Sequence, residues 1–220
     1  MIDEHLASAG ASAGSVTRDR ILDVAEALFA DKGLSGTSMR DIASRSDLTA
    51  ASLYNHFSGK DDLYAAVLQR GILPLIELMH QLAASDRQGD AASETIRAVM
   101  HHLGSRPHLP RLISHEAIAG GAHIARIARD WVRPLLEQGV FEMKRDATAM
   151  WEPEEYPLVI AAWIHLVLGH FALAPLFREV LHDDPLSPAM LERQTEMLCK
   201  LARRVMTPET DPEESPVAAH

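Results

Sequence analysis

Two very short helical patterns, separated by about four residues, constrain the fold of this chain more than any other feature of its sequence. Ser38 and Asp41 have the spacing of a capping box, which predicts a helix from there to about Arg45. Thr49 is a suitable N-cap for the next helix, which we expect to end near His56. Two short helices joined by a tight turn have the helix-turn-helix layout.

Helical patterns fill most of the remaining chain, and no segment has a convincing period-two strand pattern. A longer helix over 17–32 should precede the pair and stop at Gly33. A fourth should open near Ser58, and Gly71 with Pro74 should kink or divide it. Further helices are expected at 90–104, 110–119, 123–145, 154–181 and 187–206. The predicted fold class is therefore all-α.

Composition divides the chain into a small and a larger helical domain. Ala, Ser and Gly over 1–14, and Pro, Glu, Thr and Ser over 207–220, predict flexible tails. Between them we expect a three-helix domain at 15–62 and a helical bundle at 63–206. Apolar residues make up 47% of the chain, enough for a buried core. The net charge of −10 argues against a protein that coats nucleic acid without sequence preference. Residues 15–60, however, contain six basic and six acidic residues and are neutral overall.

One segment, 157–177, contains no Lys, Arg, Asp or Glu. Its length approaches the roughly 20 residues of a membrane-spanning helix, but two prolines and the lack of a flanking basic cluster oppose that interpretation. We therefore expect that this segment does not span a membrane and instead forms a helix that is buried in the core or in a subunit interface. A monomer would expose too much apolar surface here, which predicts a homodimer formed through 154–206. No secretory signal is evident and Cys199 is the single cysteine, so a reducing cytoplasm is the expected location.

The second helix of the pair has one apolar and one polar face. Leu53 and Phe57 are four residues apart and can both face the core. Small side chains such as Ala50 allow the backbone to approach the floor of the major groove of DNA, where a methyl can meet a thymine methyl. Arg40 can donate two hydrogen bonds to a guanine edge. The candidate phosphate contacts are Tyr54, His56 and Lys60.

From Thr17 to Leu68 the chain resembles the DNA-binding domain of the TetR family of transcriptional regulators. The matching stretches are Ile21-Leu22-Asp23-Val24-Ala25, Leu28-Phe29, Lys32-Gly33, Thr37-Ser38-Met39-Arg40-Asp41-Ile42-Ala43, Ala51-Ser52-Leu53-Tyr54-Asn55-His56-Phe57 and Ser58-Gly59-Lys60-Asp61-Asp62-Leu63. The resemblance implies that double-stranded DNA contacts Ser38, Arg40, Thr49, Ala50, Ser52, Tyr54, Asn55, His56 and Lys60. It also implies a C-terminal ligand-binding and dimerising bundle. Many members have Gly where this chain has Asp47, which could repel a phosphate or only shape the turn.

Each candidate DNA contact also has a purely structural interpretation. The ring of Tyr54 could pack inside the small domain, and His56 could serve mainly to hold the fold. Arg40 could pair with a nearby acid, and Lys60 could be a solvated surface charge.

The bundle offers a candidate apolar effector site, although large side chains at helical spacing are more often plain core. Its candidate lining is Met79, Met100, Trp131, Phe141, Trp163, His165 and Phe171. We expect no metal and no cofactor, because a di-iron site in a helical bundle needs paired Glu-x-x-His motifs on facing helices, and the motif at Glu77 and His80 does not by itself make such a site. The absence of a phosphate loop and of a nucleophile elbow argues against an enzyme. The predicted function is a ligand-responsive repressor that binds a palindromic operator as a homodimer. A metal-responsive sensor or an activator of the same fold, and an all-α enzyme, are the alternatives.

Overall fold

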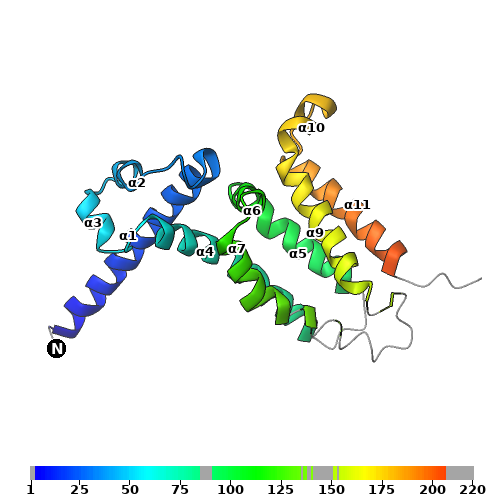
Figure 1. Ribbon diagram of the computed structural model, residues 1–220, viewed down its shortest axis with the longest axis horizontal. Coiled ribbons are helices and arrows are strands. Elements are labelled where there is room, and N and C mark those ends of the chain that lie inside the picture. Colours follow the sequence, from blue (N-terminus) through cyan, green and yellow to red (C-terminus); the bar gives the residue numbers. More distant parts are fainter. Residues whose placement is uncertain are drawn as a thin grey trace, which may run out of the picture.

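The structure is a computed structural model, and every regular element that it describes is a helix (Figure 1). It describes residues 3–84, 91–134, 136–137, 140, 151–152 and 154–206, and side chains within 15–81, 92–130, 132–134, 136–137, 140, 151–152 and 154–205. No strand occurs in these ranges, which confirms the predicted all-α fold class.

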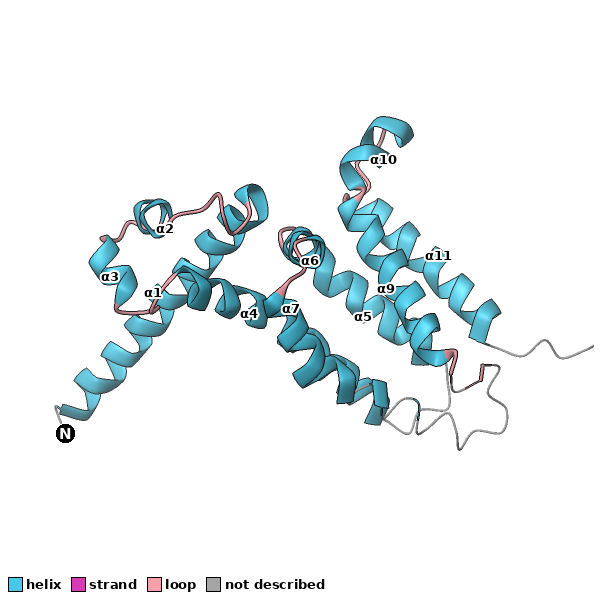
Figure 2. Cartoon of the chain, viewed as in Figure 1, coloured by secondary structure: helices cyan, strands magenta, loops and turns pink. Residues whose placement is uncertain are grey.

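The N-terminal part contains one long helix, two short helices and the start of a second long helix. These are α1 (Asp3–Lys32), α2 (Met39–Arg45), α3 (Ala50–Tyr54) and α4 (Lys60–Ala84). Figure 2 shows how short α2 and α3 are, and how loops connect them to their neighbours. The prediction that α1 begins near Thr17 is wrong, because the helix takes in residues 3–14 of the expected tail. That stretch is rich in alanine and has no proline, so nothing in it interrupts a helix.

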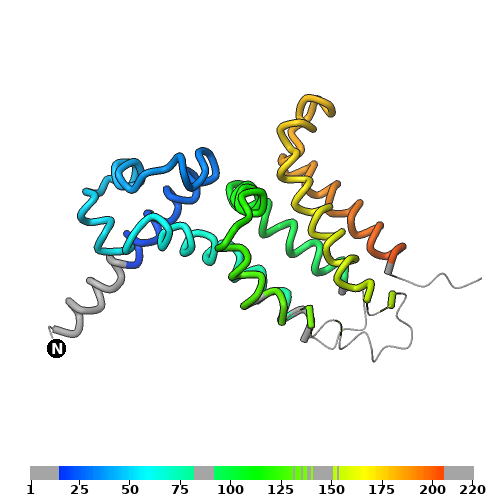
Figure 3. The backbone as a smooth tube through the Cα atoms, viewed as in Figure 1, coloured from blue at the N-terminus to red at the C-terminus, as the bar shows by residue number. Residues whose placement is uncertain are grey.

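The linker between the two parts is α4, which remains one helix through Gly71 and Pro74. Of the prediction that these residues kink or divide the helix, division is therefore wrong, and the kink stays a prediction. In the tube view α4 leads from the α1–α3 end of the molecule towards the remaining helices (Figure 3). It packs against α1 on one side and against helices α5 (Ala91–Gly104), α6 (Leu109–Ile118) and α7 (Ala122–Ile127) on the other.

The C-terminal part continues with a π-helical segment and three more helices. These are η1 (Ala128–Val132), α9 (Tyr156–Ala172), α10 (Ala174–Leu181) and α11 (Pro188–Met206). The single helix expected over 154–181 is wrong, because α9 and α10 meet at Leu173 with a bend of 66°. Pro175 explains the break, since it lacks the N–H that would continue the hydrogen bonds of α9. The last residues of the helix expected over 123–145 lie outside the described part.

The buried core runs from α1 through α4, α5 and α6 to α9 and α11. Within it, α11 packs against α5 and α9 packs against α6. The uncharged segment is only partly buried in this protomer, because several large apolar side chains of α9, α10 and the residue between them are exposed. These are Leu158, Ile164, Leu166, Leu173, Leu176, Phe177, Val180 and Leu181. Among the described helices no single one is long and apolar enough to cross a membrane, and only the bent pair of α9 and α10 reaches that length together.

Candidate nucleic-acid interface

A capping box at Ser38 fixes the start of α2. The Ser38 hydroxyl oxygen accepts a hydrogen bond from the backbone N–H of Asp41 at 3.1 Å, and the Asp41 carboxylate accepts one from the Ser38 N–H at 3.1 Å. The Ser38 hydroxyl also donates to this carboxylate at 2.6 Å. These hydrogen bonds, led by that of the Ser38 side chain, lower the pKa of Asp41 below its ordinary value. The predicted cap is confirmed, and it holds Arg40 in the first turn of α2.

The turns on either side of α2 use backbone conformations that few residues adopt. Gly33 ends α1 with a φ of +69°, and Thr37 is buried with its hydroxyl 2.9 Å from the Gly33 carbonyl oxygen. Asp47, between α2 and α3, has a φ of +54°. This is the left-handed region, which glycine adopts freely and aspartate tolerates better than most residues. Asp47 therefore shapes the turn at the position where the resemblance places glycine.

The helix α3 is held by its apolar face and presents its polar face to solvent. Leu53 and Phe57 are buried, as the sequence predicts. Thr49 caps the helix by accepting a hydrogen bond from the Ser52 N–H at 3.1 Å. Tyr54 keeps 54% of its surface exposed, so the interpretation that its ring packs inside the domain is wrong. Of the remaining candidates here, Thr49 and Asn55 are exposed, and Ala50, Ser52 and His56 are half-buried.

Two basic side chains flank this face. Arg40 is exposed on α2 and forms no ion pair within the described residues, which removes the interpretation that it only pairs with an acid. Lys60 is half-buried at the first residue of α4. Next to it, the Asp62 carboxylate accepts a hydrogen bond from the Ser58 N–H at 2.9 Å. The negative charges of Asp61 and Asp62, in the first turn of α4, interact favourably with the backbone N–H groups at the N-terminus of this helix.

One contact near α3 was missed by the sequence analysis. The guanidinium of Arg18, on α1, lies 4.7 Å from the centre of the Phe57 ring. A cation over an aromatic face is attracted by the ring quadrupole, so Arg18 ties α1 to the residues that follow α3. The two residues are 39 positions apart, and no local sequence signal joins them.

The predicted ligand residues are only partly brought together. Met100 and Phe171 are buried in one hydrophobic cluster, and half-buried Trp163 packs against it. Met79 is half-buried on α4. His165 is exposed, so the prediction that it lines the interior is wrong for this protomer. It lies between Ile164 and Leu166 on the side of α9 that the chain leaves uncovered. The side chains of Trp131 and Phe141 are outside the described part.

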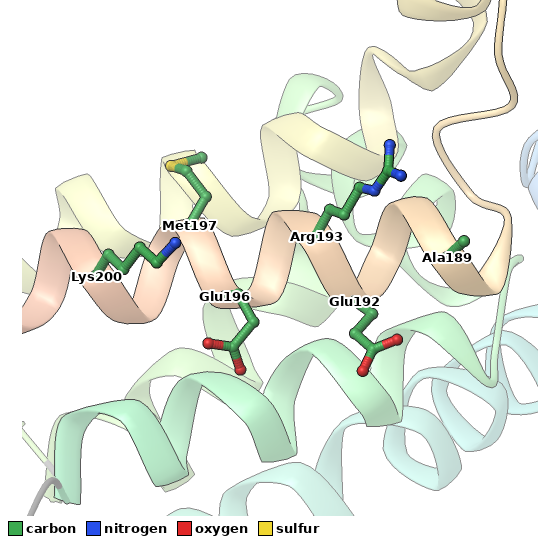
Figure 4. A pocket seen from close by; sticks show the side chains of 6 residues that line it. All are labelled: Ala189, Glu192, Arg193, Glu196, Met197 and Lys200. Carbon is green, nitrogen blue, oxygen red and sulfur yellow. The ribbon is translucent and has the colours of Figure 1, made fainter.

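Two open hollows, of about 420 and 320 Å³, lie along α11, and neither includes a residue of the predicted ligand set. The first is lined by Ala189, Glu192, Arg193, Glu196, Met197 and Lys200. Figure 4 shows the two glutamates on one side of α11 and Met197 with Arg193 on the other. Within the described residues, no three side chains of His, Cys, Asp or Glu lie close enough to hold a metal ion.

Comparison with known proteins agrees with this geometry. Residues 21–67 match the family model described as bacterial regulatory proteins, tetR family. The HTH-type transcriptional repressor KstR2 of Rhodococcus jostii is 29% identical over 64% of this chain and 64% of its own length. The HTH-type transcriptional regulator AcrR of Shigella flexneri is 35% identical over 40% of this chain and 41% of its own length. The chain thus matches less than two thirds of these relatives.

The solved structures extend the likeness to the fold of most of the chain. SmeT, described as the repressor of the Stenotrophomonas maltophilia multidrug efflux pump SmeDEF, superposes with a TM-score of 0.64 at 18% identity. The match covers 88% of this chain and 91% of SmeT. Residues 21–67 are therefore similar to the DNA-binding segment of the tetR family of bacterial regulatory proteins, and the helical fold of the chain is similar to that of SmeT.

Proposed function

We propose that this protein is a transcriptional repressor that binds a palindromic DNA operator as a homodimer and acts in the cytoplasm. The observation that carries the proposal is the face of α2 and α3. Leu53 and Phe57 are buried and hold that face against the core of the small domain. Arg40, Tyr54 and Asn55 are exposed and can contact DNA. A short helix so presented fits the major groove, with its side chains reaching base edges and its flanks reaching phosphates.

The exposed apolar side chains of α9, α10 and α11 support the homodimer. Met197 and Leu201 of α11 are also exposed, and they extend the apolar surface of α9 and α10. At Gly169 nothing lies within 4 Å of the position a Cβ would take, and Ala162 is exposed, so a second helix could approach α9 closely there. A second copy of this chain would cover the surface, and two-fold symmetry of the protein would demand two-fold symmetry of the operator.

A small apolar effector is the proposed control. The buried Met100 of α5 and Phe171 of α9, with half-buried Trp163, belong to the apolar core of the C-terminal part, and an effector inserted into that core would favour one arrangement of α4 over another. A coupling of about 1–3 kcal/mol would lower operator affinity roughly 5–150-fold. Trp163 provides a readout, since its fluorescence should change when the compound binds.

The test is selection of DNA by the purified protein. We expect it to select a palindromic duplex from a random library and to bind that duplex at least about 10³-fold more tightly than random DNA. Tyr54→Phe and Lys60→Ala should weaken binding to all sequences alike, and Lys60→Ala should reduce the salt dependence, whereas Arg40→Ala should also relax the base preference. Equal affinity for selected and random duplexes would refute the repressor.

A further inference from the structure

A proline inside the linker helix leaves a backbone acceptor without its helical donor. Pro74 lies within α4 and has no N–H, so the carbonyl oxygen of Arg70, four residues earlier, cannot receive the usual helical hydrogen bond. A carbonyl left in this state inside a protein must find another donor or lose free energy.

The donor comes from the turn between α5 and α6. Arg106 donates from Nη1 to the Arg70 carbonyl oxygen at 2.9 Å. Its side chain is mostly buried, with 24% of its surface exposed. A side chain of the C-terminal part thus replaces the hydrogen bond that the proline removes from α4.

A second side chain from the same region holds the next carbonyl. The Nε2 atom of His102, near the end of α5, lies 2.8 Å from the Gly71 carbonyl oxygen. A carbonyl can only accept, so Nε2 carries the proton. Gly71 itself allows the close approach, since a Cβ there would clash with the Leu109 side chain. The segment of α4 just before Pro74 is therefore contacted by three residues from α5, the turn and α6, namely His102, Arg106 and Leu109.

These contacts extend to α1 of the DNA-binding part. Glu26 of α1 is a buried carboxylate, 2.9 Å from Nη2 of Arg70 and 3.7 Å from Nη2 of Arg106. Arg70 also pairs with Asp23 at 2.8 Å. A buried carboxylate is costly unless it is paired, so Glu26 links α1 to both arginines. One guanidinium, that of Arg106, contacts α1 and α4 at once.

We propose that His102 and Arg106 are positioning residues, here called the α4 clamp, which fix the DNA-binding domain at one angle to the C-terminal part. The inference rests on the proposed function and names two residues of this chain that position its DNA-binding domain. Arg106 joins the α5–α6 turn to the Arg70 carbonyl of α4 and to Glu26 of α1. In a dimer the angle sets the separation of the two recognition helices, which must match the half-site spacing of the operator.

The first experiment compares a complete operator with half of it. The probes are the palindromic duplex selected by the wild-type protein and a duplex carrying one half-site, and the variant is Arg106→Met. We expect affinity for the full duplex to fall about 10-fold, while affinity for the half-site stays within about 2-fold, because only the angle between the domains is lost. The control is Arg111→Met, which removes the same charge from an exposed position of α6 with no ion pair in the described residues.

Four outcomes would overturn the α4 clamp. An equal loss on both duplexes would make Arg106 a general stabiliser, and no loss on either would make it dispensable. Equal losses in Arg106→Met and Arg111→Met would reduce the effect to net charge. A wild-type protein that selects no duplex would refute the proposed function itself, and the positioning role with it.

The second experiment tests the physical basis of the α4 clamp without DNA. In Pro74→Ala the new N–H can bond to the Arg70 carbonyl, so Arg106 becomes less necessary. We expect Arg106→Met to lower the melting temperature by about 3 °C in the wild-type background and by about half as much in Pro74→Ala. Equal decrements in the two backgrounds would show that the proline does not create the site of the α4 clamp, and would overturn the inference even if the protein binds its operator.

Discussion

The helices α1–α3 and the helices α9–α11 differ in how their apolar side chains are covered. In α1–α3 each apolar stripe is covered within the protomer, so that Phe29, Ile42 and Leu53 have no exposed surface. In α9 and α10 one face joins the core and the other exposes large apolar side chains, among them Leu158, which keeps 70% of its surface exposed. The first region completes its core with its own chain and leaves a polar face for a ligand. The second leaves an apolar face, which only another surface can complete.

The largest effect should come from breaking the self-contained core. Phe57→Ala removes a buried ring beneath α3 and should cost about 3–5 kcal/mol. We expect loss of operator binding and faster hydrogen exchange in α1–α3, while the dimer persists in light scattering. Tyr54→Ala is the matched control, because its ring is mostly exposed. That variant should lose DNA affinity with a stability change within about 0.5 kcal/mol. Dissociation of the Phe57→Ala dimer would mean that the two regions are not independent.

A smaller effect should come from charging the uncovered face. Leu166→Lys places an ammonium on the exposed side of α9 and should weaken the dimer by about 2 kcal/mol, or roughly 30-fold. Sedimentation over a range of concentrations should show the 24.2 kDa protomer appearing earlier than in the wild type. Ile118→Lys, at an equally apolar but isolated site on α6, should leave the dimer unchanged. The same shift in both variants would place the interface elsewhere.

Loss of the α2 cap should have a more local effect. Ser38→Ala removes the hydroxyl of the capping box and should cost about 1 kcal/mol. Hydrogen exchange should increase in α2 and α3 but not in α9 or α11. Ser35→Ala, in the exposed turn before it, serves as the control and should change neither. A loss of protection spread over both regions would remove the contrast between them.

The region that completes its own core was also the easier one to predict. Ser38, Thr49 and Gly33 act on the next few residues, so their roles as two caps and a stop can be read from the sequence. The break at Leu173 had an equally local signal in Pro175, but the long uncharged run favoured a continuous helix.

The contacts that join the two parts could not be predicted in the same way. Arg106 lies 36 residues from Arg70, and no periodicity relates the positions. The exposure of His165 likewise depends on which side of α9 the other helices cover, and that is a property of the assembled bundle. The sequence therefore specified the candidate DNA contacts better than the candidate ligand site, because the first depend on short-range chemistry and the second on packing between distant helices.

The smallest expected effect is a pH dependence confined to α9. His170 is half-buried, with its Nε2 atom 3.1 Å from the Pro185 carbonyl oxygen. Burial lowers its pKa, and the hydrogen bond to Pro185 opposes that shift without cancelling it. Because the pKa is lower in the folded protein, the unfolded chain takes up the proton first. The stabilisation is therefore complete above the ordinary histidine pKa of about 6.5 and decreases as the pH falls through the folded value.

His170→Gln keeps a donor for Pro185 but cannot be protonated, so it should remove that part of the pH dependence. Melting curves between about pH 8 and 5 should show the wild type losing roughly 1–2 °C more than the variant at the acidic end. His115→Gln, at an exposed histidine of α6, should follow the wild type. Parallel curves for wild type and His170→Gln would mean that protonation of this ring costs the bundle nothing. In that case the uncovered side of α9 opens readily enough for water to reach the protonated His170 ring. The difference in local stability between α9 and the buried core of α1–α3 would then be larger.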